Sequence, residues 1–330
     1  MLSFKQFLLR EGGAGGHMAH PFDIAKDGKE LIDLFKQAVD YIKKGASSVK
    51  IDGVNAAARL VDGKFVLDRG SAKPLDIKGV RPEDLESRFG PGHGFLEIGK
   101  TVLGILDAAY SSTKSDLDKL GLTSNPNILL DIEYVKGQTN VIKYKNVNNF
   151  LAVHGLKEVK PKNKNPKTGE VTSRTTSNIP FDRATMNDFI YKLNKVAEKY
   201  GFAVLGNVGV TLEKAPNFNA ALSKKITLNG KTKTLKDWLS GVKISLPLIT
   251  KKEYQSILSG DKKDLSEKQI NDFIVYTATI DLGDAILQVA TSPLGDLKDQ
   301  EGIVVKDEAG DTYKITGSFV LRGMESAFQK

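Results

Sequence analysis

The sequence predicts an α+β protein, because strand-like and helical segments follow one another without the regular strand–helix repeat of a parallel sheet. Three observations lead to this expectation. A strand hairpin follows an amphipathic helix near residue 50, helical spacing dominates much of the middle of the chain, and the C-terminal part returns to strands. The sequence has no internal repeat.

The composition is that of an ordinary soluble, globular protein, with 40% hydrophobic and 27% charged residues in a chain of 330. No apolar run approaches the ~20 residues of a membrane span, and the N-terminus lacks the apolar core of a secretory signal. The absence of cysteine excludes disulfides and thiolate metal sites and is compatible with the cytoplasm. A net charge of +8 favours a polyanionic partner, since neutralised phosphates release counterions.

The first quarter of the chain predicts a tether, a helix and a hairpin. Residues 1–25 are expected to form a short helix and a tether, in which EGGAGGHMAHPFD (11–23) disfavours regular structure; the glycines, with His17 and His20, would also suit a phosphate-binding loop. Residues 47–68 alternate like strands around a turn, VDGK at 61–64. Between them, a helix ended by Gly45 is predicted by six apolar residues: Leu31, Leu34, Phe35, Ala38, Val39 and Ile42.

The remaining elements complete the α+β pattern. Residues 157–176, KEVKPKNKNPKTGEVTSRTT, have few apolar side chains and are expected to form a mobile basic loop, which could also follow a phosphate backbone. We expect one domain over 26–330, with 157–290 as a mixed helical and basic-loop insertion. Helices are predicted over 98–112, 186–201, 234–241, 253–260 and 265–286, and strands over 127–135, 140–147, 150–156, 303–306 and 312–320.

The strongest chemical signal is a short tetrad near the first hairpin. Lys50 begins K-x-D-G, which continues with Asp52 and Gly53. Alone, such a tetrad is typical of a solvated turn. It gains weight from motifs that follow it in order: Arg69-Gly70, LDIEYV around Glu133, EGIVVK at 301–306 and YKI at 313–315.

This ordered set resembles the motifs of the covalent nucleotidyltransferase superfamily, which contains the ATP-dependent DNA ligases, the RNA ligases and the messenger-RNA capping enzymes. K-x-D-G matches its first motif, Arg69-Gly70 the next, DIEYV the third, EGIVVK the fourth and YKI the start of the fifth. The resemblance covers about residues 45–156 and 290–320. It implies a nucleotidyltransferase (ATP-grasp-like) ligase fold of antiparallel sheets flanked by helices. In contrast to the family pattern, we expect a large insertion and no C-terminal OB domain.

The resemblance also implies an activity, an ATP-dependent polynucleotide ligase that forms a covalent lysyl-AMP at Lys50. AMP would pass to a 5′-phosphate end, which a 3′-hydroxyl then attacks, with ATP and Mg²⁺ or Mn²⁺ required and nucleic acid as the partner. Five residues after Lys50 this sequence has Asn55, and in this it resembles the RNA ligases of phages and trypanosomes, which have Asn at that place. RNA is therefore expected as the substrate rather than DNA. The opening SFKQFLLREGG resembles proteins of large tailed phages, which would place the chain in the cytoplasm of an infected host cell.

Phosphoryl transfer explains why these residue types are needed. An attacking amine must be neutral, and the non-bridging phosphate oxygens need positive charge around them. By resemblance, Lys306 and Lys314 would supply that charge, and Glu301 and Glu133 would hold the metal. The nucleotide would contact a larger set: Lys50, Asp52, Asn55, Arg69, Glu133, Phe150, Lys306 and Lys314.

Each of these residues also has an ordinary structural interpretation. Asp131 and Glu133 share one strand face, which solvent could cover. Lys306 could be a charge that protects a sheet edge. Arg69 could pair with Asp68 or with Asp76 at the surface.

Three departures from the motif pattern leave other functions open. Val153 stands where a base-stacking ring is expected, so Phe150, His154 or an apolar clamp would take that role. Thr316 replaces a second motif lysine, and the insertion, with its basic loop and Trp238, would replace the missing substrate-binding domain or merely stabilise the fold. The alternatives are a DNA ligase, a GTP-using capping enzyme, and a non-catalytic phage structural or nucleic-acid-binding protein.

Overall fold

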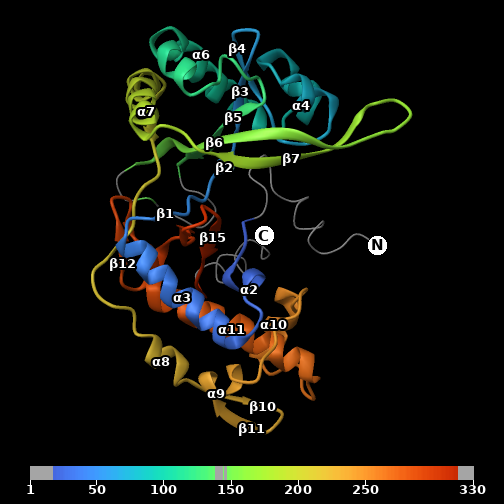
Figure 1. Cartoon of the computed structure of the whole chain (residues 1–330), viewed down its shortest axis with the longest axis vertical. Coiled ribbons are helices and arrows are strands. Elements are labelled where there is room, and N and C mark those ends of the chain that lie inside the picture. The colour runs from blue at the N-terminus through green and yellow to red at the C-terminus, as the bar shows by residue number, and fades with distance from the viewer. Residues whose placement is uncertain (1–17, 138–143, 145–146, 319–330) are drawn as a thin grey trace. The chain divides into compact units, whose positions relative to one another are not determined.

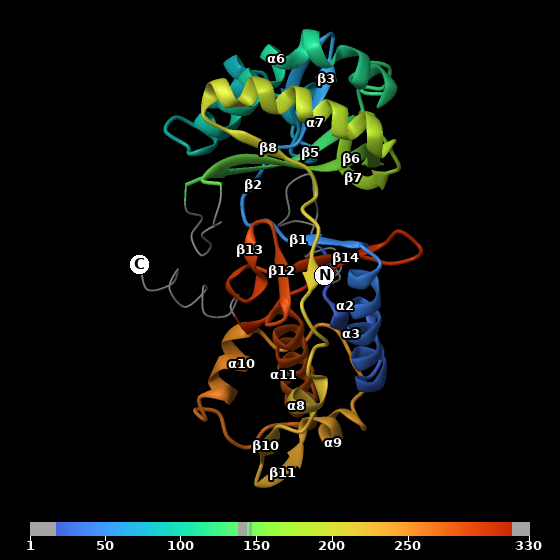
Figure 2. The same ribbon diagram turned by 90° about the vertical axis from the view of Figure 1, so that its left-hand side faces the viewer.

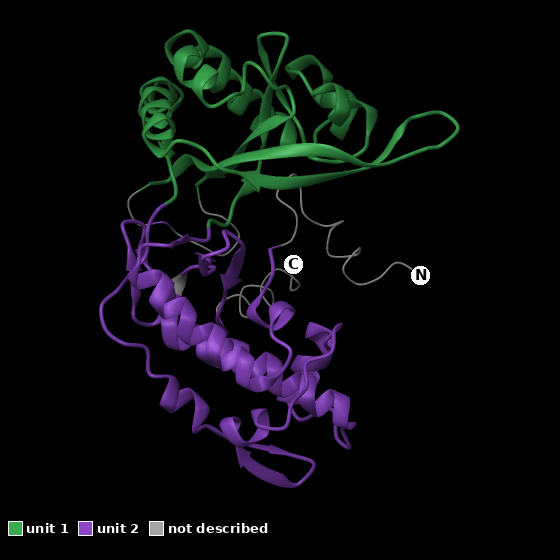
Figure 3. Ribbon diagram, in the orientation of Figure 1, with its two compact units in different colours: residues 1–17, 51–139, 147–207 green, residues 18–50, 140–146, 208–330 purple. Residues whose placement is uncertain are grey.

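The computed structural model describes residues 18–137, 144 and 147–318. They form two compact units, unit 1 with residues 51–137 and 147–207 and unit 2 with residues 18–50, 144 and 208–318 (Figure 3). The chain passes from unit 2 to unit 1 inside the K-x-D-G tetrad, between Lys50 and Ile51. Residues 157–290, expected as one insertion, are shared between the units. The helix expected before residue 18 and most of the strand expected at 140–147 lie outside the described residues.

Unit 1 contains a seven-stranded sheet (Figures 1 and 2). Its main path is the antiparallel order β4-β3-β5-β6-β7, while β2 pairs with β5 and β8 runs parallel to β6. The predicted turn at 61–64 is confirmed, with Asp62 and Gly63 at positive φ between β3 and β4. The strands are β2 Val54–Asn55, β3 Ala58–Val61, β4 Lys64–Leu67, β5 Ile128–Lys136, β6 Asn149–Lys164, β7 Val171–Ile179 and β8 Ala203–Leu205.

Helices cover one face of this sheet and bury its apolar side chains (Figures 1 and 2). Leu130 and Ile132 of β5 share a core with Leu103 and Leu106 of α6 and with Phe189 of α7. The helix predicted at 98–112 is confirmed and is longer than expected. The helices are α4 Pro74–Lys78, α5 Leu85–Phe89, α6 Phe95–Lys119 and α7 Arg183–Ala197, with 3-10 turns at Pro82–Asp84 and Glu198–Tyr200.

The prediction of a mobile loop at 157–176 is wrong, because these residues form most of the long β6–β7 hairpin, whose end extends beyond the helices of unit 1 (Figure 1). The hairpin forms with few apolar residues, because the hydrogen bonds between β6 and β7 satisfy the amides and carbonyls of the main chain. Val159 is buried with Ala57 and Leu129 on the sheet face opposite the helices. At the turn, the Asn165 amide donates to the Glu170 carbonyl over 2.7 Å.

Unit 2 contains three small antiparallel sheets, with strand orders β1-β14-β15, β13-β12-β9 and β10-β11. The first sheet joins distant parts of the chain, because β1 pairs Ser47 with Val305 and Val49 with Ile303. The sequence predicted strands in 47–68, at 303–306 and at 312–320, and β1, β14 and β15 lie in these ranges. The last of them, β15, ends at Ile315 rather than at residue 320. The strands are β1 Ser47–Val49, β9 Thr211–Leu212, β10 Lys225–Leu228, β11 Lys231–Thr234, β12 Ala290–Ser292, β13 Gly295–Asp296, β14 Ile303–Lys306 and β15 Thr312–Ile315.

The helices of unit 2 include two long ones, α3 and α11, which lie side by side (Figures 1 and 2). Leu31 and Phe35 of α3 and Ile274 of α11 are fully buried, as the helical spacing predicted. The predicted helices over 234–241, 253–260 and 265–286 are confirmed within a few residues. The helices are α2 Pro21–Ile24, α3 Gly28–Lys43, α8 Phe218–Leu222, α9 Leu235–Leu239, α10 Lys251–Leu258 and α11 Glu267–Leu287, with a 3-10 turn at Leu297–Asp299.

The α+β class is thus confirmed, with mostly antiparallel sheets and packed helices in both units. Among the described residues, no helix combines the length and the apolar character that a membrane span requires.

Candidate functional site

The predicted nucleophile, Lys50, lies directly after β1, beside a sheet of unit 2. One face of this sheet is buried, and the opposite face carries lysines. Ile303, Val305 and Tyr313 turn to one side and are buried. Alternation along the strands places Lys306 and Lys314 on the opposite face, because Val304 pairs with Lys314 and Lys306 pairs with Thr312. Lys50 follows the end of β1, beside this sheet.

Lys50 and Glu301 form an ion pair, with 2.5 Å between Nζ and Oε2. Both side chains are about one-fifth to one-quarter exposed, at 20% and 24%, so the pair is reachable from solvent. The backbone fixes its position, since the Lys50 amide donates to the Gly302 carbonyl over 2.9 Å. Gly302 is required here: a Cβ at this residue would lie 2.0 Å from the Ile315 carbonyl oxygen. The first and fourth motifs therefore meet through adjacent strands.

Lys314 is the second predicted lysine that joins this pair. Its amide donates to the Ala19 carbonyl over 2.8 Å, which anchors β15 to the segment before α2. Burial and the nearby Lys50 ammonium lower the pKa of Lys314 to about 8, although the Glu301 carboxylate opposes the shift. An ammonium that is costly to bury is suited to an incoming anion, which would lower that cost.

Two further charged residues belong to this group, and sequence reasoning missed both. Lys251, the first residue of α10, interacts electrostatically with Glu301 and with Lys314. Asp23, in α2, interacts with Lys314, and burial raises the pKa of its carboxyl. We call Lys50, Lys251, Lys314, Glu301 and Asp23 the lysine cluster. Nothing in the sequence distinguishes Lys251 from the adjacent Lys252, and Asp23 lies in the HPFD segment, which was expected to be a tether or a phosphate-binding loop, with no role for Asp23 itself.

Lys306 shares a sheet face with Lys314, but its side chain is exposed at the end of β14. Its amide donates to the Ala46 carbonyl over 2.9 Å, so the main chain is fixed. The structure therefore places Lys50, Glu301 and Lys314 together and leaves Lys306 two residues further along the same face.

In unit 1, Glu133 is the centre of a second polar group. Its Oε1 accepts the Gly53 amide over 3.0 Å, and its Oε2 lies 2.9 Å from Nε2 of His154. Gly53 is fixed by close packing, because a Cβ would lie 2.7 Å from the Tyr134 carbonyl oxygen. Burial opposes the charging of His154, but the Glu133 and Asp131 carboxylates and the hydrogen bond to Asn207 together outweigh it, so the pKa of His154 is raised.

Asn55 and Arg69 lie next to this group. Asn55 Nδ2 donates to Asp131 over 3.0 Å, and Asp131 also pairs with Lys157 at 2.7 Å. The buried Oδ1 of Asn55 has no hydrogen-bond partner among the described residues, which leaves an acceptor for a ligand hydroxyl or amine. Arg69 donates to the Asn55 carbonyl over 2.9 Å and lies over the Phe95 ring. Of the two pairings that the sequence left open as an alternative, Asp68 is bound by Arg59 and Arg174 instead, and Arg69 interacts electrostatically with Asp76.

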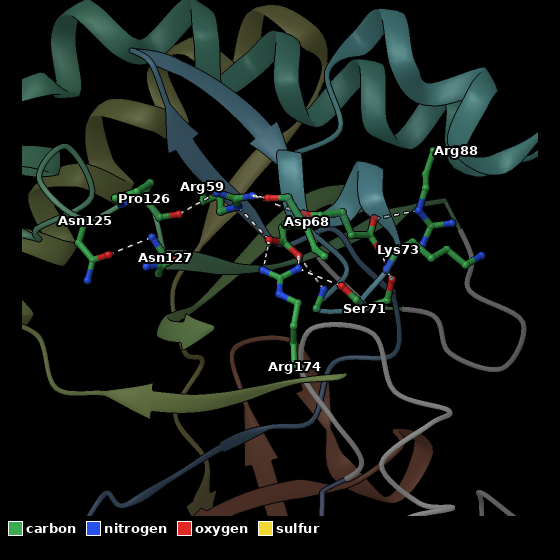
Figure 4. A network of polar contacts seen from close by, with 12 residues as sticks. Arg59, Asp68, Ser71, Lys73, Arg88, Asn125, Pro126, Asn127 and Arg174 are labelled. Atoms are coloured by element: carbon green, nitrogen blue, oxygen red, sulfur yellow. Dashed lines mark hydrogen bonds and ion pairs between the residues drawn. The ribbon is translucent and has the colours of Figure 1, made fainter. Parts of the chain in front are cut away.

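Asp68 is instead the centre of a buried arginine network (Figure 4). Arg59 donates to it over 2.8 Å and Arg174 over 2.6 Å, while Arg88 binds Asp76 with two donors, each at 2.8 Å. Both carboxylates are completely buried. Arg174 also donates to the Ser71 carbonyl over 3.0 Å, so the network fixes both the β6–β7 hairpin and the loop after Arg69.

Three further predicted residues of unit 1, Phe150, His154 and Asp52, differ in accessibility. Phe150, proposed to stack on a base, is fully buried and presents no open ring face. His154 is partly exposed, with 26% of its side chain accessible, and is the better placed of the two rings. Asp52 is partly buried in the connection between β1 and β2.

The donor set of the lysine cluster is compatible with a magnesium ion that a nucleotide brings with it. In the described ranges, no three carboxylate or imidazole side chains converge as a protein-only metal site would require. Mg²⁺ is commonly held by one or two carboxylates together with substrate phosphates, and Glu301 supplies one such carboxylate. Glu133 already accepts from Gly53 and contacts His154.

Comparisons with protein-family models, with curated proteins and with solved structures gave no match to this chain.

Proposed function

We propose that this chain is an ATP-dependent polynucleotide ligase that forms a lysyl-AMP at Lys50 and acts on RNA rather than DNA. The observation that carries the proposal is the 2.5 Å pair between Lys50 and Glu301, joined by Lys314. These residues come from opposite ends of the sequence, yet the antiparallel pairing of β1, β14 and β15 brings them together.

The first step is attack of the Lys50 amine on the α-phosphorus of ATP. A P–N bond forms, the P–O bond to the β-phosphate breaks, and pyrophosphate leaves with its electron pair. The amine must first lose a proton, and Glu301 is the acceptor at hydrogen-bond distance. Lys314 stabilises the charge that develops on the phosphate oxygens.

Two further transfers complete the reaction. The AMP moves from Lys50 to a 5′-phosphate, so that the P–N bond breaks and a pyrophosphate linkage forms. A 3′-hydroxyl then attacks that 5′-phosphate, loses its proton and displaces AMP. When bound, Mg²⁺ or Mn²⁺ would neutralise phosphate charge, with Glu301 as a ligand.

The residues of unit 1 suit contacts with the nucleotide, and by resemblance Glu133 would contact the ribose or a metal-bound water. Asn55, with its open Oδ1 acceptor, suits a ribose hydroxyl or a base amine. Arg69 would contact phosphate or ribose, and Glu133 would contact ribose through its pair with His154. The exposed lysines of the β6–β7 hairpin suit a polynucleotide backbone.

The proposal is tested by a search for the covalent intermediate. The full chain is incubated with labelled ATP or GTP and Mg²⁺ or Mn²⁺, denatured, and examined by gel and by intact mass. We expect one AMP per chain, lost in Lys50→Ala and retained in Lys43→Ala, a matched change at an exposed lysine of α3.

The outcomes separate the alternatives. Label from GTP alone would replace the proposal with a capping-type enzyme. Sealing assays on RNA and nicked DNA then decide the substrate. No adduct with either nucleotide and either metal ion, in a chain with normal circular dichroism, would leave a non-catalytic nucleic-acid-binding protein.

A further inference from the structure

Unit 2 contains a groove that lies between α3, α8 and α9 and shares no residue with the lysine cluster. Its volume is about 470 Å³, within the ~300–1,000 Å³ of ligand-binding clefts. Helices α8 and α9 belong to residues 157–290, which the sequence suggested as a substitute for a substrate-binding domain. The groove is lined by cations, one carboxylate and apolar side chains, including Lys29, Lys36, Lys236, Asp33, Ile32 and Phe218.

The part of the groove that α3 supplies is one face of this helix. Its side chains line up over two turns, because they occupy positions i, i+3, i+4 and i+7: Lys29, Ile32, Asp33 and Lys36. Asp33 is paired with Lys36 at 3.3 Å. In the part of the chain that the structure describes, neither Lys29 nor Lys236 has a carboxylate within ion-pair distance. The groove therefore presents two lysines whose charge no described side chain neutralises.

The walls of the groove are fixed by close packing. The Gly28 amide donates to the Val242 carbonyl over 3.2 Å, and a Cβ at Gly28 would lie 2.3 Å from the Leu239 carbonyl oxygen. The start of α3 is thus pressed against the end of α9. Trp238 Nε1 donates to the Ile226 carbonyl over 3.1 Å, which fixes α9 to β10. A groove built in this way loses little conformational entropy when a ligand enters it.

Positive charge continues from the groove onto the β10–β11 hairpin, which adjoins α9 (Figures 1 and 2). Residues 224–243 contain six lysines and one aspartate. One of these lysines, Lys224, is paired with Asp281 of α11 at 3.0 Å, and Lys233 lies 4.9 Å from the centre of the Trp238 ring. This density of positive charge favours a polyanionic partner.

Anionic membranes and nucleic acids both match this charge, and the apolar side chains distinguish them. A membrane-surface site combines cations with an exposed apolar face that enters the lipid. Among the described residues, no exposed large hydrophobic side chain belongs to α3, α8, α9, β10 or β11. The aromatic ring of the groove, Phe218, is half-buried and lines the same groove as the cations. Sites for single-stranded nucleic acid combine a basic groove with an aromatic ring in this way.

We propose that the groove binds a single-stranded polynucleotide, with Lys29 and Lys236 at its phosphates and Phe218 against a base, and that the β10–β11 hairpin extends the basic path. The inference rests on the proposed function only for the choice of RNA as the polynucleotide. Stacking on Phe218 does not depend on the identity of the base, because every base has a π face. The groove therefore holds RNA without sequence preference.

The groove is distinct from the reaction site at Lys50. It involves the first half of α3, whose start packs on α9, whereas Ala46, just after the end of α3, accepts the Lys306 amide. Helix α3 has 16 residues and is about 24 Å long, so its two ends lie far apart. The groove thus holds the strand away from its reacting end, and binding there needs no terminal phosphate.

The test measures binding of the full chain to a fluorescein-labelled, single-stranded RNA with a 5′-hydroxyl end, by fluorescence anisotropy and without ATP. The double variant Lys29→Ser, Lys236→Ser should bind about 10-fold more weakly at low ionic strength, and its slope of log K against log salt should fall by about 1.4, or ~0.7 for each lost phosphate contact. The matched control is Lys43→Ser, Lys263→Ser, which removes the same charge at two exposed lysines of unit 2 outside the groove.

Phe218→Leu separates the base contact from the phosphate contacts. It keeps an apolar side chain but removes the ring, so we expect RNA to bind about 10-fold more weakly with an unchanged salt slope. Normal RNA binding by this variant, with an unchanged circular dichroism spectrum, would overturn the base contact. Equal weakening by the double lysine variant and its control would overturn the groove. Binding to phosphatidylserine vesicles that depends on Lys29 and Lys236, without binding to RNA, would replace the polynucleotide with a membrane.

Adduct formation distinguishes this inference from the proposed function, because attachment of AMP to Lys50 needs no RNA. If labelled AMP is attached but RNA binds equally to the double variant and to the original chain, the ligase proposal stands and the groove fails. If RNA binding depends on Lys29 and Lys236 but no adduct forms with ATP or GTP, the groove stands and the ligase proposal fails.

Discussion

Among the described residues, the arginine network of unit 1 and the lysine cluster of unit 2 each bring together three cations and two carboxylates. They differ in the kind of cation. In unit 1, two of the arginines give further donors to carbonyl oxygens: Arg59 to Pro126 over 3.0 Å and to Ile77 over 2.5 Å, and Arg174 to Ser71 over 3.0 Å. Arginine stays charged at all working pH values and cannot act as a nucleophile.

The lysine cluster has the opposite properties. Its side chains are partly accessible, its cations can lose a proton, and burial already lowers the pKa of Lys314 to about 8. The number of charges therefore does not identify a site. Cations whose hydrogen-bond donors are bound by backbone carbonyls are typical of a structural network. A lysine that can lose its proton and that solvent can reach is typical of a candidate site.

The largest effect should come from breaking the arginine network. Asp68→Asn would leave Arg59 and Arg174 buried without a counter-charge, and we expect the free energy of unfolding to fall by about 3–5 kcal/mol. Urea unfolding followed by circular dichroism measures this. Asp62→Asn, at an 87% exposed carboxylate in the same hairpin, is the control and should change stability by less than about 0.5 kcal/mol. Equal stability of the two variants would contradict a structural role.

The lysine cluster and Lys306, which lies further along the same sheet face, should respond in activity instead of stability. Glu301→Ala and Lys306→Ala should each reduce the rate of adduct formation by about 10²-fold, since a charge stabiliser is removed, and should change the free energy of unfolding by less than about 1 kcal/mol. Single-turnover labelling with ATP measures the rate. Glu308→Ala, an exposed carboxylate paired with Lys44, is the matched control. Near-normal labelling in either variant would remove that residue from the site.

The chemical difference between the cations predicts a pH effect. The pKa of Lys314 is about 8 in the folded chain and near ~10.4 when unfolded. Below pH 8 both states hold the proton, and the cost of burying the charge is present in full. Between pH 8 and about 10.4 the unfolded chain holds more protons, so stability rises with pH.

Lys314→Met lacks this titration and serves as the reference. Between pH 7.5 and 10.5, the stability of the original chain should rise relative to that of Lys314→Met by on the order of 2 kcal/mol. Urea unfolding at several pH values measures the difference, and parallel curves would contradict the shifted pKa. The arginine network should contribute no such slope, because its guanidinium groups keep their protons.

Much of the fold could be predicted, because periodic burial produces a periodic sequence. The apolar spacing of α3 and the glycine turn of the β3–β4 hairpin predicted those elements correctly. The same signal failed for the outer part of β6–β7, residues 157–176. There, buried Val159 and the ion pairs of Lys157 with Asp131 and of Arg174 with Asp68 hold a hairpin whose composition is typical of a loop.

The candidate site was predictable only where local motifs mark it. Lys50, Glu301 and Lys314 were named from ordered short motifs, and strand pairing brings them together. Lys251 was not predictable, because it and Lys252 are identical neighbours, and only the folded chain brings Lys251 within electrostatic range of Glu301. The sequence around a single charged residue does not show which distant residues the packing of its helix will bring near it.

The smallest expected effect is on RNA binding by the β6–β7 hairpin. This hairpin contains both a structural arginine and exposed lysines. Its base is fixed by Arg174 in the arginine network, and further out it carries the exposed lysines Lys162, Lys164 and Lys167. Replacing all three with serine should reduce the slope of log K against log salt for a single-stranded RNA by about 2, because each neutralised phosphate of a single strand contributes ~0.7 to that slope. Filter binding at several salt concentrations measures the slope.

Substitution of the three lysines is preferable to deletion of residues 157–174, because that deletion would also remove the buried Val159 and Arg174. Serine replacement of Lys100, Lys114 and Lys119, exposed on α6, changes the net charge by the same amount and is the control. If both triple variants lower the slope equally, RNA responds to overall charge and the hairpin has no special part. If only the hairpin variant lowers it, with adduct formation unchanged, the lysines bind the polynucleotide while Arg174 merely holds the hairpin that carries them.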